Sequence, residues 1–275
     1  DFEAISKSNF ARDDQLRYAR EASGFISDSQ QPFFLSVNYP DAHRPFTPQV
    51  DGLPEKVLTG EDVEALPFFG ISNPQLRQQT ADYYNCVSRL DTLVGDLLEV
   101  LELSGKADNT IVAYIGDHGA DMLRGKRTSY EGGTRVPFIM RTPGQSHKGI
   151  IREELVSLVD LVPTLLELSG TQSIPDLPGK SLAPLIENRS VDWRRYLFTE
   201  FHIHSAHNYY PQRTVQDDRY KLIVNLMPGR INPGYQFTNE RFFDDLITTI
   251  NQAGEPVTGA YHRMHAPPKY ELHDL

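Results

Sequence analysis

Residues 110–119 read TIVAYIGDHG, a β-branched apolar run that stops at Gly116 and continues into the polar triplet Asp117-His118-Gly119. A short apolar run bounded by turn residues is typical of a buried strand. The segment before it ends at Ser104-Gly105, a common way for a helix to terminate. Strands that alternate with helices favour an α/β fold, in which reactive side chains gather in the loops at the carboxyl ends of strands.

A long helix is predicted immediately before this strand. Asn73-Pro74 supplies an N-cap side chain and a proline for the first helical position, and Ser104-Gly105 supplies the end signal. Between them, positions of one helical face recur at alternating steps of three and four. These positions are Leu76, Thr80, Tyr83, Val87, Leu90, Val94, Leu97 and Leu101.

Other elements are predicted on both sides of this pair. Residues 32–39 (PFFLSVNY) predict a second buried strand, which ends at the polar loop 40–45, and residues 136–140 predict a third. A helix is expected over residues 155–168 and a surface helix within residues 1–30. The first two strands both run into polar loops.

From about residue 191 the sequence predicts mainly short strands. Asp217-Asp218-Arg219 lies between two short apolar runs and predicts a hairpin turn, and residues 240–251 predict a helix. We therefore expect residues 1–190 to belong to the main domain and residues 191–275 to form a smaller α+β subdomain with an antiparallel sheet. The strands expected in this subdomain cover residues 196–199, 213–216, 220–224 and 270–272.

Composition excludes several classes of protein. The 275 residues include 37 acidic and 27 basic side chains, a formal net charge of −10. This acidic balance argues against a nucleic-acid binder that relies on a basic face. A single cysteine, Cys86, excludes a disulfide framework and a cysteine-rich zinc module. No apolar run approaches the roughly 20 residues that span a bilayer, so no membrane span is expected.

Three polar segments carry the side chains suited to chemistry. The first is Asp41-Ala42-His43-Arg44-Pro45, the second is Asp117-His118-Gly119, and the third, residues 125–137 (GKRTSYEGGTRVP), places Lys126 among glycines. Each segment taken alone is at least as typical of a structural or solvated loop. The order and spacing of the three segments, taken together, indicate a function more strongly than any one of them does.

That order and spacing resemble the sulfatase family of the alkaline-phosphatase-like superfamily. Residues 159–170 (VDLVPTLLELSG) and 177–185 (LPGKSLAPL) resemble two further motifs of the same family. The carboxy-terminal part is most similar to the sulfamidase subgroup, the heparan N-sulfatases, through residues 210–216, 220–226 and 253–259. The resemblance implies an alkaline-phosphatase-like sandwich, a central mixed sheet flanked by helices, and hydrolysis of sulfate esters or N-sulfates of sulfated sugars such as glycosaminoglycans.

The resemblance assigns two metal ligands, Asp117 and His118. A carboxylate suits a hard cation such as Ca²⁺, the expected ion. Many relatives carry an amide at the position of His118, and imidazole is a poorer ligand for Ca²⁺. His118 therefore keeps an alternative role of holding the nucleophile or the sulfate, and Mg²⁺ and Mn²⁺ stay open as alternative ions.

The other expected roles are catalytic and substrate-binding. His43 matches the histidine that protonates the departing oxygen or nitrogen, and Lys126 matches the lysine that contacts sulfate. Arg44 and His204 are candidates for contact with a sugar or its carboxylate, and surface or packing roles are equally open for both.

The nucleophile of the family, a formylglycine made in a C/S-x-P-S-R motif, is expected outside this chain. The nearest match, residues 86–89 (CVSR), lacks the proline and lies within the predicted long helix. Cys86 is therefore interpreted as a buried small apolar residue. The family's first metal aspartates precede the strand of His43 and are also expected outside the chain. The isolated chain is accordingly expected to be inactive.

Two alternatives to the sulfatase function stay open. One is a phosphonate or phosphate-ester hydrolase of the same superfamily, and the other is a non-catalytic module that binds sulfated glycans. The expected partner is a sulfated carbohydrate and not a nucleic acid, and a homo-oligomer is left open. The family resemblance implies an exported protein, periplasmic, extracellular or lysosomal, although no signal segment is seen in this chain.

Overall fold

The computed structural model describes residue 12 and residues 14–144, 149–204, 208–233 and 243–275. The chain divides into two compact units. Unit 1 contains Asp1–Pro143 and Tyr235–Tyr261, and unit 2 contains Gly144–Gly234 and His262–Leu275.

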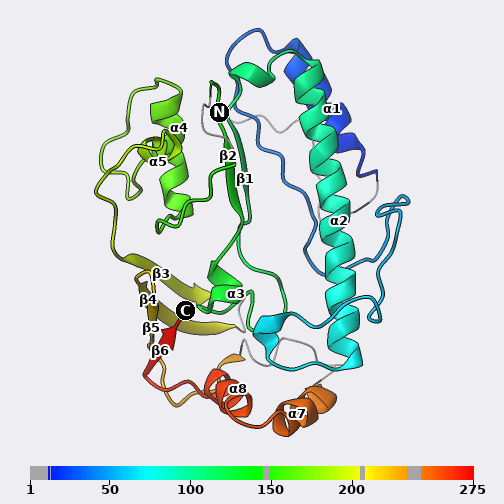
Figure 1. The fold of residues 1–275 in the computed structure, drawn as a ribbon, viewed down its shortest axis with the longest axis vertical. Coiled ribbons are helices and arrows are strands. Elements are labelled where there is room, and N and C mark those ends of the chain that lie inside the picture. Colours follow the sequence, from blue (N-terminus) through cyan, green and yellow to red (C-terminus); the bar gives the residue numbers. More distant parts are fainter. Residues whose placement is uncertain (1–11, 13, 145–148, 205–207, 234–242) are drawn as a thin grey trace. The chain divides into compact units, whose positions relative to one another are not determined.

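Two helices that pack side by side dominate unit 1 (Figure 1): α1 (Arg17–Asp28) and α2 (Pro74–Leu103). The predicted N-cap of α2 is confirmed, because the Asn73 side chain accepts a hydrogen bond from the Leu76 amide at 2.8 Å. A hydrophobic cluster joins the two helices and the first strand. Its buried members are Ala22, Ile26, Leu101 and Ala107, with Phe25, Phe33, Leu35, Leu97, Val100 and Val112 packed around them.

The buried face of α2 differs from the predicted one in the middle of the helix. Val87, expected on the apolar face, is exposed, while Asn85 and Arg89 are fully buried. Asn85 pairs with the backbone of Leu58, accepting from its amide at 2.8 Å and donating to its carbonyl at 2.9 Å. The centre of α2 is therefore buried because it binds the preceding loop through polar groups, which hydrophobic periodicity does not reveal.

The strand pair of unit 1 consists of β1 (Val112–Ile115) and β2 (Phe138–Arg141), which run antiparallel. Both match predicted strands, and between them lies one helical turn, α3 (Glu131–Thr134). The strand predicted over residues 32–39 is wrong for the described structure. These residues alternate between half-buried and exposed side chains, as a strand would. They pair with no described strand, however, and a strand is defined by such pairing.

Short helices open unit 2: a 3₁₀ turn (Leu158–Asp160), α4 (Leu161–Leu168) and α5 (Ala183–Ile186). Asp160 is fully buried and accepts hydrogen bonds from the amides of Ser157 and Lys180, both at 2.8 Å. The Arg194 guanidinium holds both oxygens of the same carboxylate, at 2.6 and 2.7 Å. Asp160 thus joins the start of the helix to the loop near Lys180, which explains why these two motifs occur together.

Unit 2 also contains a four-stranded antiparallel sheet in the order β3-β4-β5-β6. The predicted hairpin at Asp217 is confirmed, since β4 and β5 are adjacent and the Asp217 amide donates to the Tyr220 carbonyl at 3.0 Å. The strands are β3 (Leu197–Ile203), β4 (Tyr209–Gln216), β5 (Tyr220–Asn225) and β6 (Tyr270–Asp274). The antiparallel sheet expected after residue 191 is therefore present.

Two helices complete the described chain. α7 (Phe243–Gln252) corresponds to the helix predicted over residues 240–251, whose first three residues lie outside the described ranges. α8 (Val257–His265) was not predicted, and the division between the units falls within it. The α/β class is confirmed, while the predicted domain boundary at residue 190 stays a prediction.

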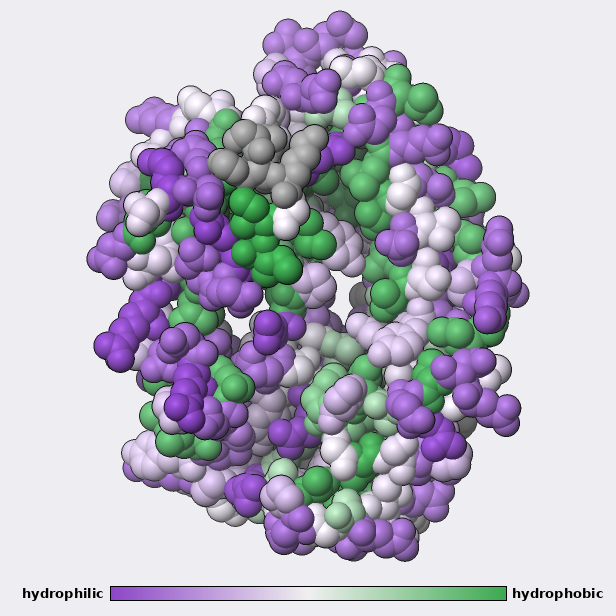
Figure 2. Space-filling model, viewed as in Figure 1, coloured by the Kyte–Doolittle hydropathy of each residue, from purple (hydrophilic) through white to green (hydrophobic). Residues whose placement is uncertain are grey.

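The surface contains both hydrophobic and hydrophilic areas. Hydrophobic areas are visible between hydrophilic ones in Figure 2, and large exposed apolar side chains include Phe198, which is 72% exposed. Within the described ranges, no helix has both the length and the apolar content that a membrane crossing needs.

We predict that Asp160→Ala lowers the free energy of unfolding of the protein by about 3–5 kcal/mol, because it leaves the half-buried Arg194 guanidinium without its carboxylate and two backbone amides without their acceptor. Urea unfolding measures this change. Asp218→Ala, in the exposed β4–β5 turn, serves as the control and should have almost no effect. Equal stability of the two variants would contradict a structural role for Asp160.

Candidate functional site

His43 lies in a tight loop whose hydrogen bonds fix its imidazole ring. The His43 amide donates to the Pro40 carbonyl at 2.9 Å, and Nδ1 lies 2.6 Å from the Arg44 carbonyl oxygen. A carbonyl only accepts hydrogen bonds, so Nδ1 carries the proton of this contact. Nε2 faces the Lys126 ammonium, with 3.4 Å between Nε2 and Nζ. The structure thus brings together two predicted site residues that are 83 positions apart.

Lys126 is an almost buried cation, only 6% exposed. Burial lowers its pKa from the ordinary value of 10.5, and the nearby Arg127 charge acts in the same direction. The carboxylates of Asp121 and Asp117 oppose this shift. The Lys126 amine therefore loses its proton more readily than a solvated lysine does.

Asp121 is the carboxylate around which the cations of the site gather. It is buried, and its Oδ2 accepts a hydrogen bond from Arg127 Nη2 at 2.9 Å. Arg44 Nε donates to the Asp121 backbone carbonyl at 2.6 Å and lies 4.0 Å from Oδ1. Burial lowers the pKa of Arg44 while Asp121 raises it. Asp121 therefore offsets the repulsion between Arg44, Lys126 and Arg127.

Close backbone contacts between glycines hold the loop that carries these groups. The Gly119 amide donates to the Gly133 carbonyl at 3.0 Å. A Cβ at Gly119 would lie 1.8 Å from the Gly132 carbonyl oxygen, and one at Gly133 would lie 2.4 Å from the Thr128 carbonyl oxygen. No larger residue fits at these two positions. The glycines are thus needed for the fold of the loop, as expected for the Glu131-Gly132-Gly133 segment.

Asp117 and His118 form the second predicted pair. Asp117 Oδ2 lies 3.3 Å from His118 Nε2, and Asp117 Oδ1 accepts a hydrogen bond from the His118 amide at 3.0 Å. The Asp117 side chain is 86% exposed, so its oxygens are accessible to a cation. Within the described ranges, no group of three or more histidine, cysteine, aspartate or glutamate side chains has the geometry of a metal site. The structure therefore places one carboxylate oxygen and one imidazole nitrogen side by side, and their role as metal ligands stays a prediction.

Asp41, two residues before His43, connects the His43 loop to the rest of unit 1. Arg89 Nε and Nη2 hold its two carboxylate oxygens at 2.7 and 3.0 Å. Arg12 Nε donates to Asp41 Oδ1 at 2.9 Å, and Arg12 Nη2 donates to the His43 carbonyl. The side chains of Asp41 and Arg89 are both fully buried. The loop of His43 is therefore fixed by charge-assisted contacts.

Cys86 lies one helical turn before Arg89 and is fully buried. Burial raises the pKa of the Cys86 thiol to about 11. Its sulfur accepts a hydrogen bond from Arg89 Nη2 at 3.4 Å. The interpretation of Cys86 as a buried packing residue agrees with this environment.

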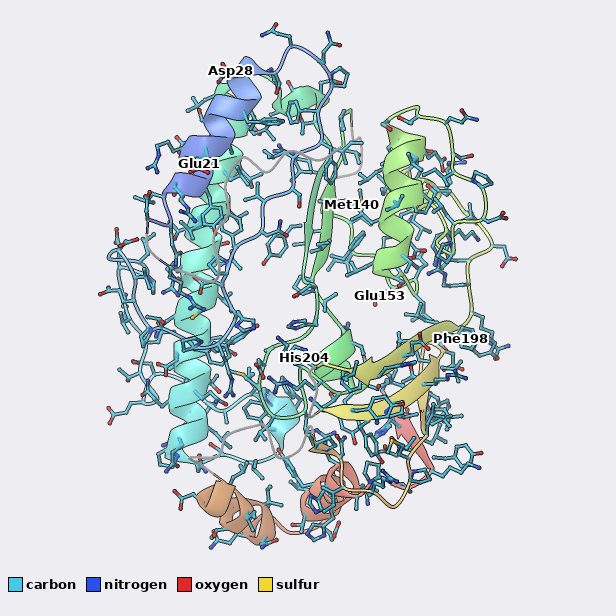
Figure 3. The ribbon with its side chains drawn as sticks, turned by 180° about the vertical axis from the view of Figure 1, so that it is seen from behind. Glu21, Asp28, Met140, Glu153, Phe198 and His204 are labelled. Atoms are coloured by element: carbon cyan, nitrogen blue, oxygen red, sulfur yellow. The ribbon has the colours of Figure 1, made fainter. Side chains whose placement is uncertain are left out.

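His204 is exposed and lies in unit 2, directly after β3, where Figure 3 labels it. Its proposed contact with substrate stays a prediction, as do the roles assigned to the other site residues. Sequence reasoning missed Asp41, Arg89, Asp121 and Arg127, because it assigned roles only to positions that match family motifs. Asp41, Asp121 and Arg127 lie close to His43 or Lys126 in the sequence, and this proximity could have indicated them.

The described site is rich in positive charge, and the His43 imidazole lies beside Lys126. Such an arrangement attracts a tetrahedral oxyanion and stabilises negative charge that develops on it. Nε2 is the nitrogen of His43 that faces Lys126 and is placed for proton transfer, because Nδ1 contacts the Arg44 carbonyl. The chemistry that fits is hydrolysis or transfer of an anionic ester group.

Comparison with known proteins gives two family matches. The profile of the sulfatase family matches residues 5–171, and the profile named N-sulphoglucosamine sulphohydrolase, C-terminal, matches residues 116–230. An arylsulfatase of Clostridium perfringens is 33% identical over 212 residues, which cover 66% of this chain and 43% of the relative. The N-sulphoglucosamine sulphohydrolase of Homo sapiens is 30% identical over 284 residues, which cover 90% of this chain and 55% of the relative.

A solved structure supports the fold. The phosphonate monoester hydrolase of Silicibacter pomeroyi superposes with a TM-score of 0.59 at 20% identity, covering 94% of this chain and 61% of that one. At this identity the likeness concerns the fold alone. The chain spans about half the length of the two curated relatives, 43% and 55%.

We predict that Gly119→Ala disrupts the loop from Asp117 to Lys126, since the added Cβ meets a backbone oxygen that cannot move independently. The unfolding free energy should fall by about 1–3 kcal/mol, the usual cost of overpacking. Hydrogen exchange of the loop amides should rise at the same time.

Gly95→Ala is the matched control for this substitution. Gly95 lies in α2 with no atom within 4 Å of the added Cβ, so alanine should stabilise the helix by up to about 1 kcal/mol. Wild-type stability and exchange in Gly119→Ala would show that the close approach is not required.

Proposed function

The chain belongs to the sulfatase family, and on this premise we propose that the full-length protein hydrolyses sulfate esters or N-sulfates of a sulfated sugar. Its relatives include enzymes named arylsulfatase and N-sulphoglucosamine sulphohydrolase. The match to the carboxy-terminal profile of the latter supports a glycosaminoglycan-type substrate. The observation that carries the proposal is the contact between Lys126 and His43.

Lys126 and His43 have different roles at the scissile bond. The Lys126 ammonium binds a sulfate oxygen and stabilises the charge that grows as the bond to sulfur breaks. His43, protonated on both ring nitrogens when substrate is bound, donates its Nε2 proton to the departing oxygen or nitrogen, which turns a poor leaving group into a neutral alcohol or amine. Their 3.4 Å separation allows one sulfate group to contact both.

A divalent cation is proposed as cofactor, with Asp117 and His118 as two of its ligands and Ca²⁺ as the expected ion. The pair fits such an ion because an exposed carboxylate oxygen and an imidazole nitrogen lie 3.3 Å apart. When bound, the cation supplies positive charge that stabilises the anionic sulfur centre and its nucleophile. The nucleophile itself, a formylglycine, is proposed to lie in a part of the protein outside this chain.

Substrate recognition is proposed to involve Arg44 and His204. Arg44 is held beside Asp121, and its guanidinium is proposed to contact an anionic sugar substituent. An exported location follows from the family resemblance and is proposed with it.

Sulfate release by the purified full-length protein tests this function. N-sulfoglucosamine and glucosamine 6-sulfate report the proposed activity, and an aryl phosphonate reports the alternative. Sulfate release that depends on added divalent cation is the expected result. Hydrolysis of the phosphonate with no turnover of either sulfate would replace the proposal by the phosphonate hydrolase alternative.

We predict that His43→Ala lowers kcat on N-sulfoglucosamine by about 10²–10⁴-fold, because the departing amine loses its proton donor. KM should change little, since the role of His43 is confined to the transition state. His202→Ala, which removes an exposed histidine of β3, is the control and should retain full turnover. An unchanged kcat in His43→Ala would remove this residue from the mechanism.

We also predict that activity falls at alkaline pH as Lys126 loses its proton. Burial lowers the pKa of Lys126 below 10.5, so the charged form is lost at a lower pH than for a solvated lysine. Lys126→Arg keeps the charge at all accessible pH values. In the His43→Ala background, where the proton of His43 no longer contributes, the alkaline limb of the kcat–pH profile should therefore move to higher pH in Lys126→Arg, even where the plateau is lower. An identical alkaline limb would assign that titration to another group.

A further inference from the structure

The loop that carries His43 is held by an unusually costly contact, the fully buried pair of Asp41 and Arg89. Arg89 projects from the middle of α2, and Asp41 lies 48 residues earlier in the chain. Two parallel hydrogen bonds join them, at 2.7 and 3.0 Å, so the guanidinium plane and the carboxylate plane are aligned. The direction of the Asp41 side chain is therefore set by a rigid helix.

Arg89 also determines the path of the chain after His43. Its Nη1 donates to the carbonyl oxygens of Thr47 at 3.0 Å and Leu53 at 3.3 Å. One guanidinium thus binds the loop before His43, through Asp41, and after it, through Thr47 and Leu53. His43 lies between the two attachment points.

A second arginine connects the same carboxylate to the backbone of His43. Arg12 Nε binds Asp41 Oδ1 at 2.9 Å, and Arg12 Nη2 donates to the His43 carbonyl. Removing Asp41 from its place would therefore also release the His43 peptide. The contacts form a continuous series from α2 to the backbone of His43.

Stability alone does not account for such a pair. Burying two charges costs much of what their attraction returns, and hydrophobic residues of similar size would serve packing as well. What the pair adds is direction, since two hydrogen bonds in one plane allow little rotation. This directional constraint acts on the loop whose histidine must face Lys126 at 3.4 Å.

We propose that Arg89 is a positioning residue for His43 and acts through Asp41. It holds the loop so that Nε2 points at the leaving atom of the substrate instead of turning away from it. A displacement of about 1 Å at a catalytic group can cost 10²-fold in rate. This inference rests on the proposed function, because it needs His43 to be the proton donor.

Two substrates with the same sulfate but different leaving groups test the proposal in the full-length protein. Phenyl sulfate needs protonation of a basic phenolate, whereas 4-nitrophenyl sulfate releases an anion that is stable without it. In Arg89→Lys, kcat on phenyl sulfate should fall by about 10- to 100-fold. The kcat on 4-nitrophenyl sulfate should fall far less, and KM should be similar for the two substrates. A loss of folded protein would instead lower both rates by the same factor.

Arg194→Lys is the matched control, because Arg194 makes an equivalent bidentate contact with the buried Asp160 in unit 2. Its effect should be the same for both substrates. Asp41→Asn keeps the size of the side chain and removes its charge, and it should reproduce the preference of Arg89→Lys for the better leaving group. Should Arg89→Lys fold poorly, Asp41→Asn makes the same comparison.

The double variant His43→Ala/Arg89→Lys gives the decisive comparison. If Arg89 acts through His43, adding Arg89→Lys to His43→Ala should produce little further loss on phenyl sulfate. Equal losses on both substrates in Arg89→Lys, or full additivity with His43→Ala, would overturn the inference while leaving the sulfatase function intact. Absence of turnover by the wild-type protein on every sulfate would overturn the proposed function itself.

Discussion

A cluster of cations around the buried carboxylate of Asp121 is the constraint on which the site depends. Lys126, Arg44 and Arg127 would repel one another in a region of low dielectric. Burial lowers the pKa of Lys126, and the Arg127 charge adds to this effect. Asp121 and its carbonyl compensate by binding both arginines. The site therefore carries a surplus of positive charge that an anionic substrate would reduce, which is a physical reason for affinity toward sulfate-like groups.

This arrangement requires two loops to approach more closely than side chains normally permit. The glycines at 119 and 133 allow the backbone of the Asp117 loop to lie against that of α3, where a Cβ would meet a carbonyl oxygen at 1.8 or 2.4 Å. On the other side, Arg89 and Arg12 bring the Asp41 loop against α2. The contact of His43 with Lys126 thus depends on two regions. Glycines allow the close backbone approach of the loop near Lys126, and buried ion pairs hold the loop of His43.

Much of the fold could be predicted from the sequence, because local signals agree with it. Asn73-Pro74 and Ser104-Gly105 define the ends of α2, and the turn at Asp217 defines a hairpin. The failures have physical reasons. Residues 32–39 have the side-chain alternation of a strand, but pairing decides whether a strand exists, and pairing is not local. The buried face of α2 was misjudged at Val87, because Arg89 and Asn85 are buried through polar contacts with a distant loop.

The candidate site likewise contains residues that local motifs predict and residues whose role depends on partners far away in the sequence. His43, Lys126, Asp117 and His118 were named because each matches a motif position, and the structure brings His43 to Lys126. Arg89 belongs to residues 86–89, a poor match to the nucleophile motif, and the sequence indicates no other role for it. Its partner Asp41 lies 48 residues away, and neither residue type nor spacing indicates that they meet. A motif identifies groups that touch substrate, whereas the groups that orient them are recognised by burial, charge and hydrogen-bond geometry.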